Sequence, residues 1–217
     1  MLEFFRPSIE ANASLHEARV FLNFLIERLL DEGHEDDALW LIEHLLRVRT
    51  NVVRKTNFQF EYLKLRGEET SGVSEYVLSY DLRFMDEMAN FGIRQIYDKI
   101  LKVRIERLGA KFLHRITWLF IEARATAARG AKSNLSTDYI RSAIEIHAQD
   151  TYRNDPINTI LNILRDCWEE LAAINPKVAT GIYEGWSAQE DELLLRLSIH
   201  ALRFLVENDV IGYRARL

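Results

Sequence analysis

Several residue types are scarce in this chain, and each scarcity narrows the class of protein. Its 217 residues include one cysteine, three prolines and nine glycines. The single cysteine, Cys167, allows neither an intrachain disulfide nor a zinc site built from several cysteines, which suits a reducing compartment. Because glycine and proline are few while Ala, Leu, Glu and Arg are abundant, intrinsic propensity favours helix over sheet.

Long hydrophobic runs are also missing. No segment approaches about 20 uninterrupted apolar residues, and the N-terminal stretch has no basic region followed by a long apolar run. We therefore expect no membrane span, no signal peptide and a cytoplasmic location. Apolar residues still make up 48% of the chain, which is ample for a hydrophobic core. The composition predicts a folded all-α protein.

The common catalytic signatures are absent as well. The sequence contains no glycine-rich phosphate loop, no GxSxG, no HExxH and no paired Cys-x-x-Cys. These absences exclude the usual nucleotide-binding, hydrolase and zinc motifs. Carboxylates lie near imidazoles at residues 31–34 and at Glu43 and His44, but the repeated Glu-x-x-His pairs of a di-metal helical bundle are missing. We expect a non-catalytic protein that holds no metal or other cofactor.

The clearest helix start is the pair Asp155 and Pro156. The aspartate can accept from the first-turn amides as an N-cap, and proline suits the first helical position because no N–H is needed there. Similar spacing at residues 140–147 predicts a helix before it, so that the two form a hairpin. Apolar residues behind Pro156 recur at steps of three and four and predict one buried helical face. They are Ile157, Ile160, Leu161, Leu164, Cys167, Trp168 and Leu171.

The N-terminal part of the chain predicts two more helices. The first should begin at a capping box, residues 14–17, and end at Gly33. The second should begin at Glu35 and, because no breaker precedes Gly67, run for about thirty residues. The segment GEETSGVS, residues 67–74, is the clearest loop.

Everything beyond that loop is predicted to be helical again. An apolar stripe over residues 73–91 favours a helix, with breaks expected near Gly92 or Gly109. A second loop is expected at residues 130–137, GAKSNLST. Further helix starts are predicted at Asn175-Pro176 and at a capping box over residues 187–190.

These elements predict about seven or eight helices in antiparallel hairpins, for which a HEAT-like repeat stack is one arrangement. The loop suggests an N-terminal hairpin, residues 1–66, and a C-terminal bundle or repeat array, residues 73–217, with one continuous domain as the alternative. Ile146-His147-Ala148 and Ile199-His200-Ala201 echo each other 53 residues apart. This echo either reflects a true repeat or is the chance similarity of apolar spacings in any helical chain.

The net charge of −5 conceals a block pattern along the chain. The sharpest feature lies in a basic block, where four cations at steps of three and four follow one helical face beside an apolar stripe. They are Arg104, Arg107, Lys111 and Arg115, the basic stripe below. The successive blocks carry −7 (1–46), +5 (47–66), −5 (67–93), +7 (94–132), −7 (133–192) and +2 (193–217).

Three interpretations of the charge pattern remain open. Acidic and basic helices can lie antiparallel and neutralise each other, which sets their pairing more than their stability. The basic stripe can instead bind an acidic protein or phosphates, or lie on a membrane surface. Nucleic acid fits poorly, since the acidic blocks would repel a phosphate backbone. A second candidate partner surface is basic too, and consists of Arg47, Arg49, Arg54 and Lys55.

One enzymatic alternative concerns Arg141 and His147, which form Arg-x5-His on an expected helix. Their spacing resembles the Arg-x4-6-His motif of the HEPN ribonucleases, and the resemblance implies metal-free RNA cleavage at a dimer interface. That family usually has a polar Asn, Asp or His after the arginine, where this chain has Ser142.

Taken together, the sequence favours an α-helical interaction or scaffold module. It would bind an acidic protein partner or self-associate through the basic stripe, with the ribonuclease as the alternative. If the stripe meets a partner, reversing Arg107 and Lys111 to Glu should weaken that binding and leave the helical content unchanged.

Overall fold

The computed structural model describes residues 19–84, 89–130, 144 and 155–208. Most of these residues are helical, so the all-α class is confirmed, while the HEAT-like stacking stays a prediction. No helix within the described ranges is both long and apolar enough to cross a membrane. The α-helices are α2 (Arg19–Asp31), α3 (Glu35–Leu46), α4 (Phe58–Leu65), α5 (Ala89–Ile96), α6 (Ile105–Gly130), α7 (Pro156–Ile174), α8 (Pro176–Ser187) and α9 (Glu192–Glu207).

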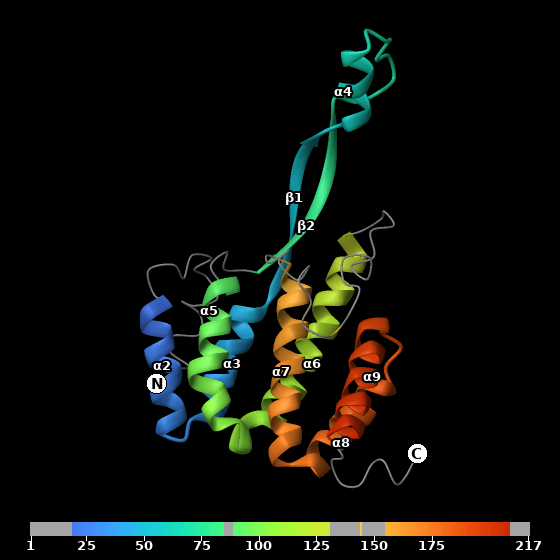
Figure 1. The fold of residues 1–217 in the computed structure, drawn as a ribbon. Coiled ribbons are helices and arrows are strands. Elements are labelled where there is room, and N and C mark those ends of the chain that lie inside the picture. Colours follow the sequence, from blue (N-terminus) through green and yellow to red (C-terminus); the bar gives the residue numbers. More distant parts are fainter. Residues whose placement is uncertain (1–18, 85–88, 131–143, 145–154, 209–217) are drawn as a thin grey trace.

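The helices other than α4 form a single body around one cluster of buried apolar side chains (Figure 1). Helix α7 lies at its centre, and the whole predicted stripe behind Pro156 is buried. Cys167 is fully buried in that stripe. Its burial raises the pKa of the thiol well above the ordinary value, so little reactive thiolate forms. The side chain of Cys167 therefore contributes to core packing.

Side-chain caps determine where the C-terminal helices begin. Asp155 Oδ1 accepts from the backbone N–H of Ile157 at 3.2 Å, and Asn175 Oδ1 accepts from that of Val178 at 3.3 Å. Both predicted starts are therefore confirmed. The predicted capping box at 187–190 is wrong: α8 continues to Ser187, and Asp191 caps α9 instead. Asp191 can accept hydrogen bonds from the first-turn amides as well as Ser187 could, and α9 begins after the aspartate.

The glycines act differently in turns and in helices. Gly33 ends α2 with φ of 84°, as predicted, because glycine enters this left-handed region without a Cβ penalty. Gly109 lies inside α6 and does not break it. A Cβ there would come 3.1 Å from Ile105 Cγ1 of the same helix and 3.4 Å from Leu171 Cδ1 of α7, so only the Ile105 side chain would be crowded. The irregularity lies earlier, in a π-helical turn (Tyr97–Leu101) and a 3-10 turn (Lys102–Arg104) between α5 and α6.

The long helix predicted from Glu35 is wrong. Helix α3 ends at Leu46, and strand β1 (Val48–Thr56) follows it. The helix predicted over residues 73–91 is also wrong in its first half, where strand β2 (Tyr76–Phe84) lies. The two strands pair antiparallel, from Val48 opposite Phe84 to Thr56 opposite Tyr76. Five of the nine β1 residues are valine or threonine, whose branched Cβ favours strand over helix.

The two strands form an arm that stands away from the helical body (Figure 1). Helix α4 and the loop at residues 67–74 lie at its tip, so that predicted loop is confirmed as a loop. At its root the arm is anchored by Phe84, which is buried, with Val48 and Leu82 packed against the same core. The division into two domains at this loop stays a prediction, while buried residues before and after it share one cluster.

Candidate functional site

The basic stripe faces the acidic end of the α2–α3 hairpin. Each of its four cations forms an ion pair with a carboxylate there. The pairs are Arg104 with Asp31 (2.6 Å), Arg107 with Glu35 (3.0 Å), Lys111 with Asp36 (2.9 Å), and Arg115 with Asp36 (2.6 Å) and Glu43 (3.1 Å). The geometry therefore matches the interpretation that acidic and basic helices neutralise each other, and binding of a partner to the stripe stays a prediction.

The direction of this pairing differs from the sequence expectation. Partner numbers rise together, from Asp31 with Arg104 to Glu43 with Arg115, so α3 and α6 run parallel and the expected antiparallel arrangement is wrong. The reason lies between them in the chain. The arm leaves and re-enters the body at the same end, and α5 then runs back before α6 begins (Figure 1).

The pairs also change the acidity of Asp36. The hydrogen bond from Lys111, with the charges of Lys111 and Arg115, lowers the pKa of the Asp36 carboxyl. A lowered folded-state pKa means that this carboxylate stabilises the fold above the unfolded-state pKa. That contribution is lost as the pH falls through the folded-state pKa.

Reversing Arg107 and Lys111 to Glu is expected to lower the urea midpoint at neutral pH. The new glutamates would oppose Glu35 and Asp36, where the native chain has ion pairs. The loss should be modest, because these side chains are partly exposed and such pairs contribute little. Urea denaturation followed by far-UV circular dichroism measures it. Adding Glu35→Lys and Asp36→Lys should restore part of the midpoint, whereas no loss and no restoration would show that the pairs are energetically silent.

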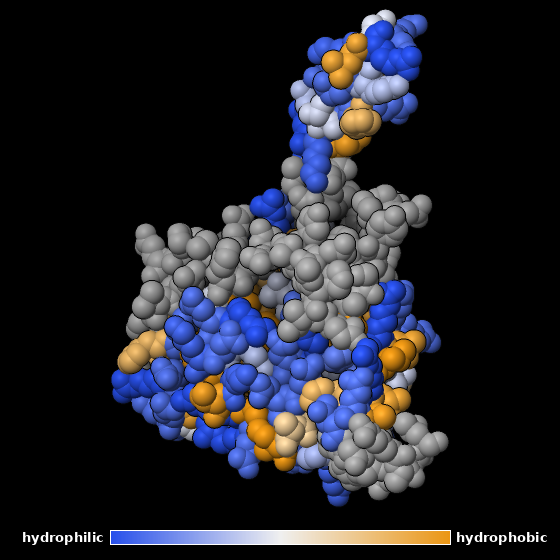
Figure 2. All heavy atoms as spheres, in the orientation of Figure 1, coloured by the Kyte–Doolittle hydropathy of each residue, from blue (hydrophilic) through white to orange (hydrophobic). Residues whose placement is uncertain are grey.

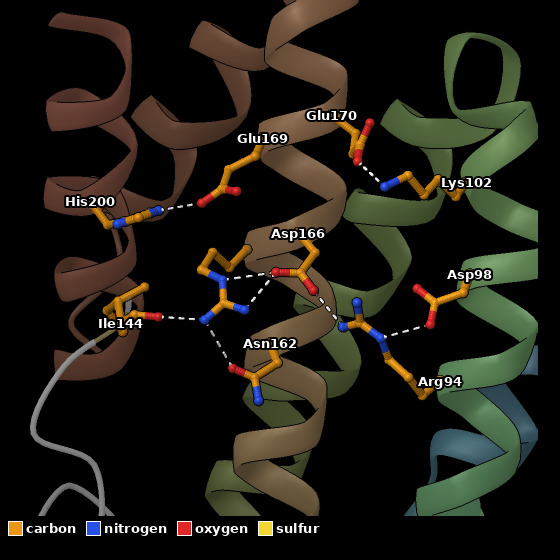
Figure 3. Close-up of polar contacts among 10 residues, drawn as sticks. Arg94, Asp98, Lys102, Ile144, Asn162, Asp166, Glu169, Glu170 and His200 are labelled. Carbon is orange, nitrogen blue, oxygen red and sulfur yellow. Dashed lines mark hydrogen bonds and ion pairs between the residues drawn. The ribbon is translucent and has the colours of Figure 1, made fainter. Parts of the chain in front are cut away.

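A second polar cluster lies along α7 (Figure 3). Arg165 is only 4% exposed, and it uses its whole guanidinium. It donates to Asp166 Oδ1 from Nε (2.8 Å) and Nη2 (2.6 Å), and from Nη1 to the Ile144 carbonyl (2.7 Å) and Asn162 Oδ1 (3.2 Å). Asp166 is in turn paired with Arg94 of α5. This cluster therefore ties α7 to α5 and to the chain segment at Ile144.

Two further contacts in Figure 3 join α7 to its neighbours. His200 Nε2 lies 2.7 Å from Glu169 Oε1, across to α9, and Lys102 pairs with Glu170. Tyr97 lies in the π-helical turn, and its phenol is buried. Desolvation by this burial raises the pKa of the phenol. These groups face helix neighbours within the body. Among the described residues, no three His, Cys, Asp or Glu side chains are grouped so as to hold a metal ion.

The residues of the ribonuclease alternative, Arg141 and His147, lie outside the described residues, as does the first copy of the Ile-His-Ala echo. Ile144 between them is described, and its carbonyl accepts from Arg165. The alternative itself stays a prediction.

The arm carries the most unusual surface of the described chain. Phe58 and Leu65 of α4 are 83% and 85% exposed. Figure 2 shows apolar side chains among polar ones on the distal part of the arm. Six of the thirteen strongly exposed large apolar side chains in the described residues lie on it, namely Val52, Phe58, Tyr62, Leu65, Tyr76 and Val77.

The strand register gives the arm one apolar face. Antiparallel partners point to the same side, and positions alternate between the two sides. Val48 with Phe84, and Thr56 with Tyr76, therefore share the side on which Val52 lies. On this apolar face Phe84 is buried at the arm root, whereas Val52 and Tyr76 farther out are exposed. A two-stranded ribbon is marginal in water unless its apolar face packs against something.

The second basic candidate lies on β1, along this arm. Its four residues are all exposed. The guanidinium of Arg54 lies 3.7 Å from the ring centroid of Tyr76, a cation–π contact on the apolar face. On the opposite face Arg49 is directly across from Arg83, a pairing of like charges that disfavours the ribbon. The candidate residues are Arg47, Arg49, Arg54 and Lys55.

An open groove of about 400 Å³ lies beside the arm root, between α3 and α6. Arg47, which precedes β1, forms one edge, and Leu119, Ile121 and Ala125 supply an apolar side. Trp118 also lines it and is 62% exposed, with its ring edge-on to His114. The groove combines an exposed aromatic ring with apolar neighbours and with charged ones of both signs, since Glu43 and Glu122 line it as well as Arg47 and Arg115.

Comparisons with known proteins name no relative. No family model, no curated protein and no solved structure matches this chain. The geometry of the described residues therefore carries the functional argument.

Sequence reasoning missed the exposed tip residues, because residues 35–66 were assigned to one helix. Two signals could have found them. Alternate positions of β2 are apolar in the sequence YVLSYDLRF, which is the period of a strand. Asn57 is a typical N-cap, and its side chain accepts from the backbone N–H of Gln59 at 3.0 Å. Together they predict strand, short helix and strand.

Proposed function

We propose that this chain is a non-catalytic protein-interaction module that presents its β-ribbon arm to a protein partner. The observation that carries the proposal is the arm tip, where Phe58 and Leu65 are exposed to more than 80%. Large apolar side chains gathered on a projecting element are typical of interaction sites, because burying them against a partner is favourable.

The arm has the chemistry of a protein contact. Phe58 and Tyr62 stack with ring centroids 6.4 Å apart, and Arg66 donates to the Tyr62 hydroxyl at 2.8 Å. Aromatic and arginine side chains are the types that most often dominate binding energy at protein interfaces. Because the cations of the basic stripe already have carboxylate partners, the proposal places the contact on the arm.

The double variant Phe58→Ser with Leu65→Ser should weaken partner binding by about 100-fold, since two buried apolar anchors would be lost. A photo-cross-linking residue at position 58, in cells, should first capture the partner for identification by mass spectrometry. Titration of the purified partner against the variant then measures the dissociation constant. The melting temperature should not change, because the two side chains pack little against the body.

The matched control is Leu195→Ser with Ile199→Ser, which removes two exposed apolar side chains from α9. It should leave the dissociation constant within about twofold, an effect smaller than 0.5 kcal/mol. Loss of binding in this control with none in the arm variant would place the contact on α9 and overturn the proposal. So would a failure of position 58 to cross-link to any protein.

A further inference from the structure

We infer that the partner contacts the arm through an acidic segment in extended conformation, which adds a third strand at the outer edge of β1. This inference rests on the proposed function of the arm and names the chemistry of the partner. Three features of β1 carry it: the backbone groups that point away from β2, the charge of the strand and the alternation of its side chains.

The outer edge of β1 is open to another strand. Among the described residues the sheet consists of β1 and β2 alone, and it stands away from the helical body (Figure 1). The backbone N–H of Asn57 donates to the Glu75 carbonyl at 2.8 Å, and this bond fixes the phase of the ladder. Bonded pairs alternate with unbonded pairs along antiparallel strands, so every second β1 residue directs its N–H and C=O away from β2. Beyond the root these residues are Thr50, Val52, Arg54 and Thr56.

A polypeptide matches this edge better than a nucleic acid does. The outward backbone groups include both donors and acceptors, and an extended peptide supplies the complement of each when it adds a strand to a sheet. The phosphates of a nucleic acid can accept from the N–H groups but cannot donate to the carbonyls. The edge therefore indicates a protein segment.

The charge of β1 favours an acidic segment. This strand carries three exposed cations and no carboxylate, whereas β2 carries one charge of each sign. An opposite charge directly across a strand pair is stabilising, and a like charge there is destabilising. A second β1, from another copy of the chain, would bring only further cations to this edge. The cations are Arg49, Arg54 and Lys55.

The like-charged pair of Arg49 and Arg83 gives this preference a definite position. The two residues lie directly across from each other, which disfavours the ribbon. A strand added at the edge would set one of its residues on the other side of Arg49. A carboxylate at that residue would offset the repulsion between the two arginines, so the added strand would also stabilise the ribbon.

The alternation of side chains sets the pattern expected in the added strand. One face of the ribbon carries the exposed apolar side chains Val52 and Tyr76, and the other carries Arg49 and Lys55. Apolar residues on one side of the added strand would extend the first face, while carboxylates on its other side would lie beside the cations. The expected segment therefore alternates apolar and acidic residues.

Two synthetic peptides test the charge preference on the whole protein. One is an end-capped peptide of about seven residues that alternates valine with glutamate, matching the reach of the outward positions, and the other has lysine in place of glutamate. Fluorescence anisotropy of labelled peptide measures the dissociation constant. The lysine peptide should bind at least about tenfold more weakly. Equal affinities, or no binding of the glutamate peptide at about 1 mM, would overturn the inference.

Reversing two cations should reverse the preference. Arg49→Glu with Lys55→Glu should bind the lysine peptide at least about tenfold more tightly than the glutamate peptide. The ribbon should persist, because a glutamate at position 49 lies across from Arg83. The matched control is Lys99→Glu with Lys177→Glu, which changes the net charge equally at exposed positions of the body. A reversal in this control too would show that net charge sets the preference, and would overturn the inference.

Amide hydrogen exchange, read residue by residue by NMR, tests the backbone contact. The glutamate peptide should slow exchange at the alternate residues Thr50, Val52, Arg54 and Thr56. Val52→Pro removes one outward N–H and should weaken the peptide at least about tenfold, since an edge strand tolerates proline where no ladder bond is lost. Val52→Thr keeps that N–H and should bind within about twofold of wild type. Protection along α6 instead, or unchanged binding by Val52→Pro, would overturn the inference.

The outcomes separate this inference from the proposed function. A protein captured from position 58, whose affinity Val52→Pro leaves unchanged, would keep the arm as the contact and overturn the added strand. A glutamate peptide that protects the alternate residues while position 58 captures no protein would support the added strand and overturn the tip contact. An oligothymidylate of about ten nucleotides that binds more tightly than the peptide, without alternate protection, would assign the cations to nucleic acid and overturn the inference.

Discussion

Arg165→Ala is expected to lower the free energy of unfolding by about 3–5 kcal/mol, because it leaves a buried charge network without its cation. Arg165 donates to Asp166, to Asn162 and to the Ile144 carbonyl while almost wholly shielded from water. Without Arg165, the Ile144 carbonyl and the Asn162 side chain would lose this hydrogen-bond donor. Asp166 would still form its ion pair with Arg94. Urea denaturation, with the slope as well as the midpoint fitted, measures the loss.

The matched control is Arg28→Ala, which removes an exposed arginine paired with Glu32 one helical turn away. Such a pair contributes about 0.3–0.5 kcal/mol, so this variant should stay close to wild type. If the two variants lose equal stability, the α7 cluster contributes no more than a surface pair does. Arg165→Lys should recover only part of the loss, since an ammonium cannot reproduce the forked hydrogen bonds of a guanidinium.

Trp168→Ala is the second substitution with a large expected effect, about 3–5 kcal/mol. The indole is fully buried, and its Nε1 donates to the Ala179 carbonyl at 2.9 Å. Its ring meets Phe204 edge-on at 5.8 Å and Trp186 at 6.4 Å, so one side chain joins α7, α8 and α9. Alanine would remove the buried apolar surface of the indole and leave a cavity in its place. The Ala179 carbonyl would also lose its hydrogen-bond donor.

Trp118→Ala offers the same chemical change at a surface position, since Trp118 is mostly exposed. It should alter the free energy of unfolding by less than about 1 kcal/mol. Comparable losses for the two tryptophans in thermal or urea denaturation would contradict the central packing role of Trp168. Intrinsic fluorescence serves as a second probe, because the buried and exposed indoles report on different parts of the body.

The helical body contains the hydrophobic core, whereas most of the arm lies outside it. The arm root is held by Phe84 in the core, and β1 and β2 leave the body there. Beyond Val52 the arm adds little to the core, so its exposed side chains are not explained by the folding of one chain. Variants of the tip should therefore change association without changing the melting temperature, while variants of α7 should do the reverse.

Strands β1 and β2 were predicted as helix because apolar spacing in a short segment fits a helix and a strand alike. The residues Val48 and Val52 fit a step of four in a helix as well as alternate positions in a strand. What decided between them is pairing with β2, which lies beyond a loop and a short helix. The local sequence indicates such long-range pairing only weakly, through the strand propensity of the β-branched residues in β1.

The basic stripe was found from spacing alone, but its surroundings were not. Steps of three and four place Arg104, Arg107, Lys111 and Arg115 on one helical face, and the structure has them there on and before α6. Which carboxylates face them depends on how α3 lies against α6. Its parallel direction follows from the arm and α5 that intervene in the chain.

By itself, the sequence determined the helical class, the start of α7 at Pro156, the cap at Asn175 and the buried face that contains Trp168, because caps and periodicity act within a few residues. Tertiary structure alone decided the projecting arm, the exposure of Phe58 and the pairing of the basic stripe with the acidic hairpin. These features depend on contacts between segments distant in the chain, and a local pattern does not specify which segments meet.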